Sequence, residues 1–143
     1  MEKKRIITDI VTAIIRNGLD MECTTESLID WYNYQLDEDH IVYLYAGDQL
    51  LGFFDWIRLP MVPADKKSAR EMLEIHGYGG NQGYIVNAII LAGKGTLRKL
   101  IAMGKAKEPD YDTLTWNNNK TGKVRSFVNA RRKNEEQLRR ISV

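Results

Sequence analysis

The chain opens with apolar residues at helical spacing. Six aliphatic side chains recur at intervals of three and four, namely Ile6, Ile7, Ile10, Val11, Ile14 and Ile15. This periodicity predicts an amphipathic helix over residues 5–17, which Gly18 ends. A second helix is predicted to follow, with Thr24 or Thr25 as its N-cap.

The pattern then changes to that of β-strands. Residues 41–45 and 50–57 are rich in β-branched and aromatic side chains, and the intervening Gly47-Asp48 is typical of a hairpin turn. Pro60 closes the second strand. Beyond it, Asp65 is predicted to cap a short helix that runs to about His76.

The most apolar run of the sequence extends from Ile85 to Leu91. It is long enough for a buried strand and too short to cross a membrane. We expect a strand over residues 84–91, interior to its sheet, which a glycine turn joins to a helix over residues 96–103. Residues 111–116 alternate as a further strand, and residues 123–128 suit either a helix or a hairpin strand.

Together these patterns predict an α/β (α+β) fold with a mixed central sheet flanked by helices, in the order α-α-β-β-(α)-β-α-β-(α). A length of 143 residues fits one domain over 1–143, with a basic helix or tail at about 129–143. The single cysteine, Cys23, excludes an internal disulfide and a cysteine-based zinc site. We therefore expect a cytoplasmic protein without metal or membrane contact.

Charge is unevenly distributed along the sequence. The net charge is only +2, but residues 120–143 contain eight Lys or Arg against two Glu. A solvated helix is the favoured explanation. The alternative is a surface for an acidic partner, a cofactor phosphate or nucleic acid, although few aromatic residues are available there to stack on bases.

The glycine turn Ala92-Gly-Lys-Gly95 is the most informative local feature. A turn that leads directly into a helix leaves several backbone N–H groups unpaired, and the helix dipole adds positive potential there. Such a turn suits a phosphate group, and Lys94 is well placed to meet one. A tight turn that needs glycine geometry and binds nothing is the alternative.

The element order and the turn resemble the GNAT-type N-acyltransferase superfamily over residues 5–128. That family's turn has the pattern Gln/Arg-x-x-Gly-x-Gly/Ala; the segment Ile90-Leu-Ala-Gly-Lys-Gly95 matches both glycines and has Ile90 at the polar position. The resemblance implies an acyl-coenzyme A cosubstrate, acetyl-coenzyme A being favoured, and an amine acceptor, either a small molecule or a protein lysine. It leaves a homodimer open.

The resemblance also implies where the cosubstrate would bind. Its pyrophosphate would sit on the amides of residues 92–97, and its pantetheine would pair with the backbone of residues 86–91. The implied cofactor-binding residues are Asn87, Ile89, Ile90, Leu91, Gly93, Lys94, Gly95, Thr96 and Asn117. For Asn87, which interrupts an apolar strand, a hydrogen bond within the core is an equal alternative.

A more local resemblance is to the toxin-activating lysine acyltransferases, a branch of the same fold. Trp56 matches a tryptophan of that branch, and Gly122-Lys-Val-Arg-Ser-Phe127 matches its Gly-Lys-Val-x-x-Phe stretch. The branch uses a histidine upstream of the hairpin, whereas the histidines here are His40 and His76.

Acyl transfer to an amine needs a positioned thioester, an acceptor for the amine's proton and donors for the oxyanion. The candidate bases are Asp55, Glu74 and His76. Tyr84 is the candidate proton donor, because Phe127 stands where the family has a tyrosine on its last helix. Each also has a structural alternative; for Asp55 this is an outward polar position on a half-exposed strand.

Three functions are therefore compared. The first is an N-acyltransferase, the second is a catalytically silent binding protein of the same fold, and the third is a basic nucleic-acid-binding protein. The two glycines and the strand order favour the enzyme.

Overall fold

The computed structural model describes residues 2–19, 22–77, 79–107, 111, 113–117 and 124–128, and the statements below concern these residues. For His76, Asn117 and residues 124–128 only the backbone is considered. The basic segment expected at about 129–143 lies outside the described residues.

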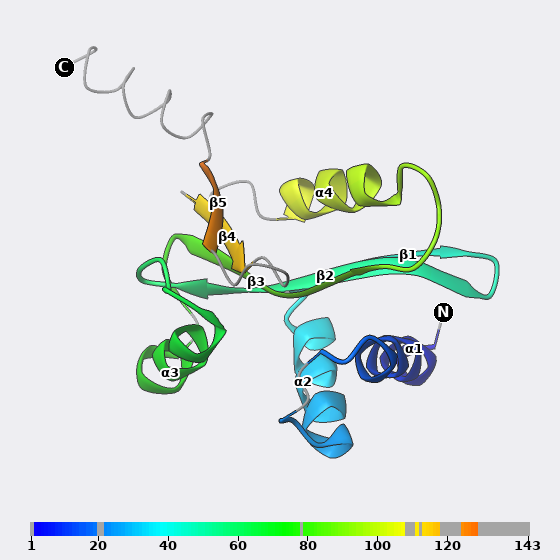
Figure 1. The fold of residues 1–143 in the computed structure, drawn as a ribbon, viewed down its shortest axis with the longest axis horizontal. Coiled ribbons are helices and arrows are strands. Elements are labelled where there is room, and N and C mark those ends of the chain that lie inside the picture. The colour runs from blue at the N-terminus through cyan, green and yellow to red at the C-terminus, as the bar shows by residue number, and fades with distance from the viewer. Residues whose placement is uncertain are drawn as a thin grey trace, which may run out of the picture. The chain divides into compact units, whose positions relative to one another are not determined.

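The chain forms a mixed α and β structure of the predicted class (Figure 1). Its elements are α1 (Lys3–Arg16), α2 (Thr25–Asp37), β1 (Ile41–Ala46), β2 (Gln49–Leu59), α3 (Lys66–His76), β3 (Gln82–Ile90), α4 (Thr96–Lys107), β4 (Thr113–Asn117) and β5 (Val124–Val128). Residues 124–128, for which the sequence left a helix and a hairpin strand open, form a strand, since their whole length pairs antiparallel with β4.

The strands form one mixed sheet in the order β1-β2-β3-β4-β5. The β1–β2 and β4–β5 pairs are antiparallel, whereas β3 and β4 are parallel. The predicted hairpin and the interior position of β3 are therefore confirmed. The chain divides into two compact units, residues 1–55 with 87–106 and residues 56–86 with 107–143, so that β2 and β3 each contribute to both.

In the first unit, helices cover both faces of the β1–β2 hairpin. Figure 1 shows α1 and α2 on one face and α4 on the other. Phe53 packs edge-to-face on Tyr32 of α2, with ring centroids 5.9 Å apart. The next residue, Phe54, points the opposite way, because a Cβ atom built on Gly104 of α4 would lie 2.6 Å from its Cζ.

This double coverage corrects the expectation that β2 is half exposed. Residues 52–55 are all buried, and Asp55 is 0% exposed rather than outward-facing. The alternation predicted from the sequence is right, since Phe53 and Asp55 share the face opposite Phe54. The face that carries Asp55 is nevertheless buried rather than exposed, because helices cover both faces of the hairpin.

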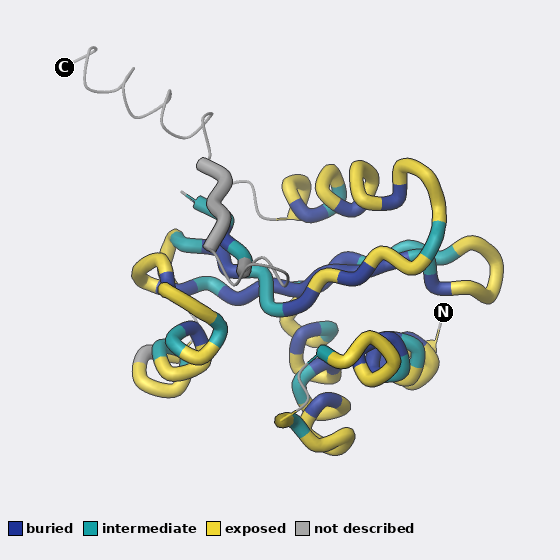
Figure 2. Tube along the Cα trace, viewed as in Figure 1, coloured by how far each residue is buried: buried dark blue, intermediate teal, exposed yellow. Residues whose placement is uncertain are grey.

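Helix α1 buries the predicted aliphatic stripe, with one exception. Ile6, Ile7, Ile10, Val11 and Ile14 are buried, and they form the core cluster with residues of α2, β1 and β2. Ile15 was assigned to the same face, but it is 52% exposed. Figure 2 shows the resulting division of α1 and α4 into buried and exposed sides.

Polar contacts fix the N-terminal part of α1 to the hairpin. The Arg5 guanidinium donates to the Asp48 backbone oxygen at 2.9 Å, and the Tyr45 hydroxyl donates to Asp9 at 2.7 Å. In α2, Thr24 is the N-cap and accepts from the Ser27 N–H at 3.1 Å.

The second unit contains α3, the first part of β3, β4 and β5. Asp65 caps α3 as predicted, accepting from the Ser68 N–H at 2.7 Å. The β3–β4 register pairs Gln82 with Thr113 and ends at Tyr84 with Thr115, although both strands continue beyond that point.

Candidate functional site

The turn between β3 and α4 has the conformation that its glycines predicted. Gly93 has φ = 94° and Gly95 has φ = 86°, values that L-residues with a side chain rarely adopt. Thr96 closes the turn: its hydroxyl donates to the Ala92 oxygen at 2.9 Å and its N–H donates to the Gly93 oxygen at 3.3 Å.

Two of the amides expected to meet a phosphate, those of Ala92 and Thr96, already donate hydrogen bonds within the protein. The Leu91 and Ala92 N–H groups both donate to the Leu51 oxygen, at 2.8 and 3.2 Å, which anchors the turn to β2. The Thr96 N–H closes the turn itself. The predicted set of residues 92–97 therefore narrows to those amides that have no acceptor within the protein.

Those remaining amides surround the start of α4. Within the described part of the chain, the N–H groups of Gly93, Lys94 and Gly95 make no hydrogen bond, nor do those of Leu97 and Arg98 in the first helical turn. No acidic residue lies in the first turn of α4, and Lys94 and Arg98 are exposed. Unpaired donors, the helix dipole and basic side chains thus combine at one place.

The predicted cofactor-binding residues of β3 alternate between two environments. Asn87 and Ile89 are 4% and 6% exposed, and Ile89 belongs to the core cluster with α1. Ile90 is 42% exposed on the opposite face, close to where a Cβ atom of Gly52 would lie. Leu91, immediately after the strand, is 44% exposed.

A buried polar network surrounds Asp55. Its Oδ2 accepts from Trp31 Nε1 at 2.9 Å and from Gln35 Nε2 at 3.1 Å, and its Oδ1 accepts from the Tyr32 hydroxyl at 3.0 Å. The same hydroxyl accepts from Asn87 Nδ2 at 2.8 Å. An ionised carboxylate only accepts hydrogen bonds, so three donors around Asp55 match its chemistry.

This network links α2 to β2 and β3. For Asn87 it corresponds to the alternative of a hydrogen bond within the core, and the partner is a residue of α2. The polar roles of Trp31, Tyr32 and Gln35 are not predicted from the sequence. The available signal was the spacing of Trp31 and Gln35, which places two donors one helical turn apart.

The other predicted site residues lie in the second unit. Glu74 is exposed on α3, and His76 is the last residue of that helix. Tyr84 is 1% exposed in β3, and Asn117 is the last residue of β4. Asp55, Asn87 and the glycine turn therefore belong to the first unit, and Glu74, His76, Tyr84 and Asn117 belong to the second.

No protein-family model matches the chain, and no curated protein matches its sequence. None of the helices within the described residues is both long and apolar enough to cross a membrane. Among the same residues, no group of three or more His, Cys, Asp or Glu side chains is arranged to hold a metal ion.

Proposed function

We propose that this protein is a small GNAT-like N-acyltransferase, which moves an acyl group, acetyl in the simplest case, from acyl-coenzyme A to an amine. The observation behind the proposal is the glycine turn that follows β3. The turn places the unpaired N–H groups of residues 93–95 immediately before α4, where a pyrophosphate would gain both hydrogen bonds and the favourable end of the helix dipole.

The strand pairing gives the proposal further support. The parallel pairing of β3 with β4 ends after Tyr84 and Thr115, although each strand continues for at least two residues. A strand whose backbone groups are not paired by a neighbour can pair with an extended ligand. The amide groups of pantetheine would use in this way the backbone of residues 87–90, which belong with the glycine turn to the first unit.

The environments of the candidate catalytic residues differ. Asp55 is enclosed by three donors, so we assign it to holding α2 against the sheet. Glu74 is exposed and available to solvent, which leaves it and His76 as the candidate acceptors for the amine's proton, directly or through water.

A specific observation also favours a second candidate, a catalytically silent protein that binds coenzyme A. Two of the four predicted catalytic side chains, those of Asp55 and Tyr84, are 0% and 1% exposed. Side chains so buried do not meet a substrate without rearrangement. A silent protein would keep the glycine turn and its ligand but transfer no acyl group.

The assay that separates the two candidates measures release of the coenzyme A thiol from acetyl-coenzyme A in the presence of a panel of amines and a lysine-containing peptide. An enzyme gives thiol release that depends on both protein and amine, together with an acetylated product detected by mass spectrometry. Binding of coenzyme A without amine-dependent release supports the silent protein. If the protein neither binds coenzyme A nor releases its thiol, both candidates are refuted.

A further inference from the structure

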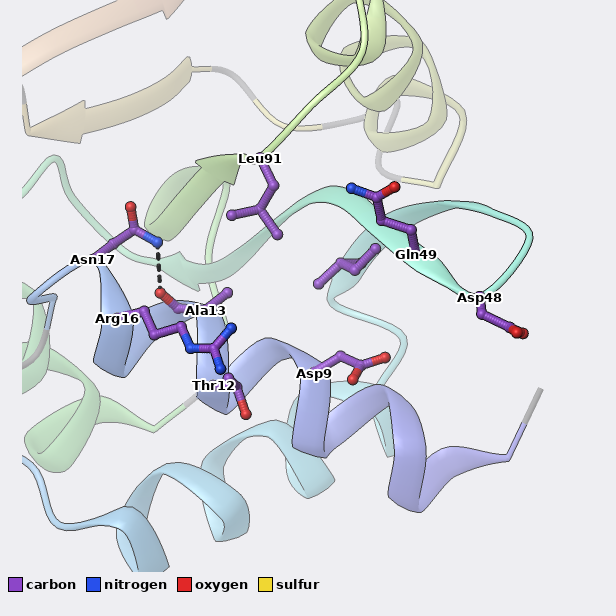
Figure 3. Close-up of a pocket in the computed structure, with 9 residues that line it drawn as sticks. Asp9, Thr12, Ala13, Arg16, Asn17, Asp48, Gln49 and Leu91 are labelled. Atoms are coloured by element: carbon purple, nitrogen blue, oxygen red, sulfur yellow. Dashed lines mark hydrogen bonds between the residues drawn. The ribbon is translucent and has the colours of Figure 1, made fainter.

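A groove of about 340 Å³ lies within the first unit, between α1 and the end of the β1–β2 hairpin (Figure 3). Asp9, Thr12, Ala13 and Arg16 line one wall. Their spacing of three, four and seven residues puts all of them on one side of α1. The groove falls in the range of roughly 300–1,000 Å³ that is usual for small-ligand sites.

The two ends of the groove differ in charge. Figure 3 shows Arg16 and Asn17 at one end, and Asp9 and Asp48 toward the other. Asp9 and Arg16 are two helical turns apart, so their Cα atoms are separated by about 10 Å at 1.5 Å per residue. The groove is therefore bipolar along its length.

The acidic end keeps a net negative charge. Arg5 is near both carboxylates there, with its Nε 3.9 Å from Asp9 Oδ2 and its Nη1 3.4 Å from Asp48 Oδ1. One guanidinium between two carboxylates leaves a single negative charge uncompensated. The Tyr45 hydroxyl donates to Oδ2 of Asp9, so Oδ1 is the oxygen available to an incoming donor.

The opposite end holds a cation without an anion. Within the described residues, the Arg16 guanidinium makes no hydrogen bond and no ion pair. Between the two ends, Ala13, Leu50 and Leu91 provide an apolar surface. Arginine forms two parallel hydrogen bonds to a carboxylate, which favours a carboxylate as its ligand group.

We propose that this groove binds a zwitterionic small molecule of the ω-amino carboxylate class. Its ammonium group lies at Oδ1 of Asp9, its carboxylate lies at Arg16, and its methylene chain lies against Leu50 and Leu91. The groove is formed by α1, the hairpin end and Leu91, not by the unpaired amides of the glycine turn. The inference therefore does not depend on acyl transfer.

The test uses 6-aminohexanoate as the probe, with hexanoate and hexylamine as controls that each keep one charged end. Isothermal titration of the full chain is expected to give saturable binding of the zwitterion in the millimolar range or tighter, and at least about tenfold weaker binding of either control. Equal binding of hexanoate or hexylamine overturns the assignment of a zwitterionic ligand, and no saturable binding overturns the site.

A pair of variants locates the binding. Arg16→Gln removes the cation from the groove, and Lys99→Gln removes an exposed cation from α4, outside the groove. Both side chains are at the surface, so both variants should fold. We expect Arg16→Gln to weaken 6-aminohexanoate binding about tenfold or more and Lys99→Gln to leave it unchanged. Binding that survives Arg16→Gln, or is lost in both variants, contradicts the proposal.

Discussion

The hydroxyl of Tyr32 should contribute strongly to stability, because it bridges two buried polar groups. It donates to Asp55 Oδ1 at 3.0 Å and accepts from Asn87 Nδ2 at 2.8 Å. Tyr32→Phe removes both bonds while keeping the ring that packs on Phe53. A hydrogen bond to a charged group is worth about 1.5–3 kcal/mol and a neutral one about 0.5–1.5 kcal/mol, so the expected loss is roughly 2–4 kcal/mol.

Urea denaturation of the wild type and the variant measures this loss directly. The midpoint should fall with an unchanged m-value, and the melting temperature should fall by roughly 4–16 °C for a chain of this size. Tyr34→Phe on the same helix is the matched control, since that side chain is 38% exposed, and its expected effect is below about 0.5 kcal/mol. Equal effects of the two substitutions would refute a stabilising role for the network.

Combining Tyr32→Phe with Asn87→Ala tests whether the bond between these residues carries part of the effect. Groups in one network should show a coupling energy of about 0.5–3 kcal/mol. Strict additivity of the two single losses would mean that the hydroxyl stabilises the fold without Asn87.

Two further predictions concern the same unit. Gly104→Ala would gain about 1 kcal/mol from helix propensity alone, but the new Cβ would lie 2.6 Å from the buried ring of Phe54. We therefore expect a net loss of about 1–3 kcal/mol in thermal or urea unfolding, and a stabilised variant would contradict the packing of α4. Burial, with the hydrogen bond to Asp9, raises the pKa of Tyr45 above its ordinary value near 10. Its neutral form therefore stabilises the fold fully below pH 10, and this contribution is lost as the pH rises further. Tyr45→Phe should make stability less dependent on pH above 10 in alkaline unfolding; an unchanged dependence would exclude Tyr45 as its source.

Much of the fold could be predicted from the sequence because its signals are local. The spacing of the α1 isoleucines, the cap at Asp65 and the hairpin turn at Gly47 each act within a few residues. The glycine turn belongs to this group, since positive φ at Gly93 and Gly95 follows from the residue type and the tight connection.

The features of the fold that could not be predicted depend on contacts between residues that are distant in the sequence. Alternation along β2 gave the face of Asp55 correctly, but burial of that face depends on α2, about twenty residues earlier. Gly52 is another example, because a Cβ there would lie 2.8 Å from the Ile89 oxygen of β3. The spacing of residues 123–128 did not distinguish a helix from a strand, and pairing with β4 decided it.

The candidate site shows the same difference between local signals and contacts that are distant in the sequence. The sequence predicts that the turn suits a phosphate, whereas it does not reveal which amides the fold already uses. Leu91 and Ala92 donate to Leu51, a contact between the start of the turn and β2 that no local pattern specifies. The candidate bases could be chosen by residue type, but whether each of them is buried could not be predicted.

Binding of coenzyme A at the glycine turn is the central claim, and Gly95→Val tests it most directly. Gly95 has φ = 86° and the control position Gly47 has φ = 56°, and a Cβ at either site has no neighbour within 4 Å. Both substitutions to valine therefore strain the backbone without a clash, but only the one at Gly95 puts a side chain where we propose that the pyrophosphate binds. A ligand at a hundred times its Kd stabilises the folded state by about 2.7 kcal/mol. Thermal unfolding with and without coenzyme A should show this stabilisation in the wild type and in Gly47→Val, and none in Gly95→Val. An absent shift in the wild type, or an equal shift in Gly95→Val, would contradict the claim.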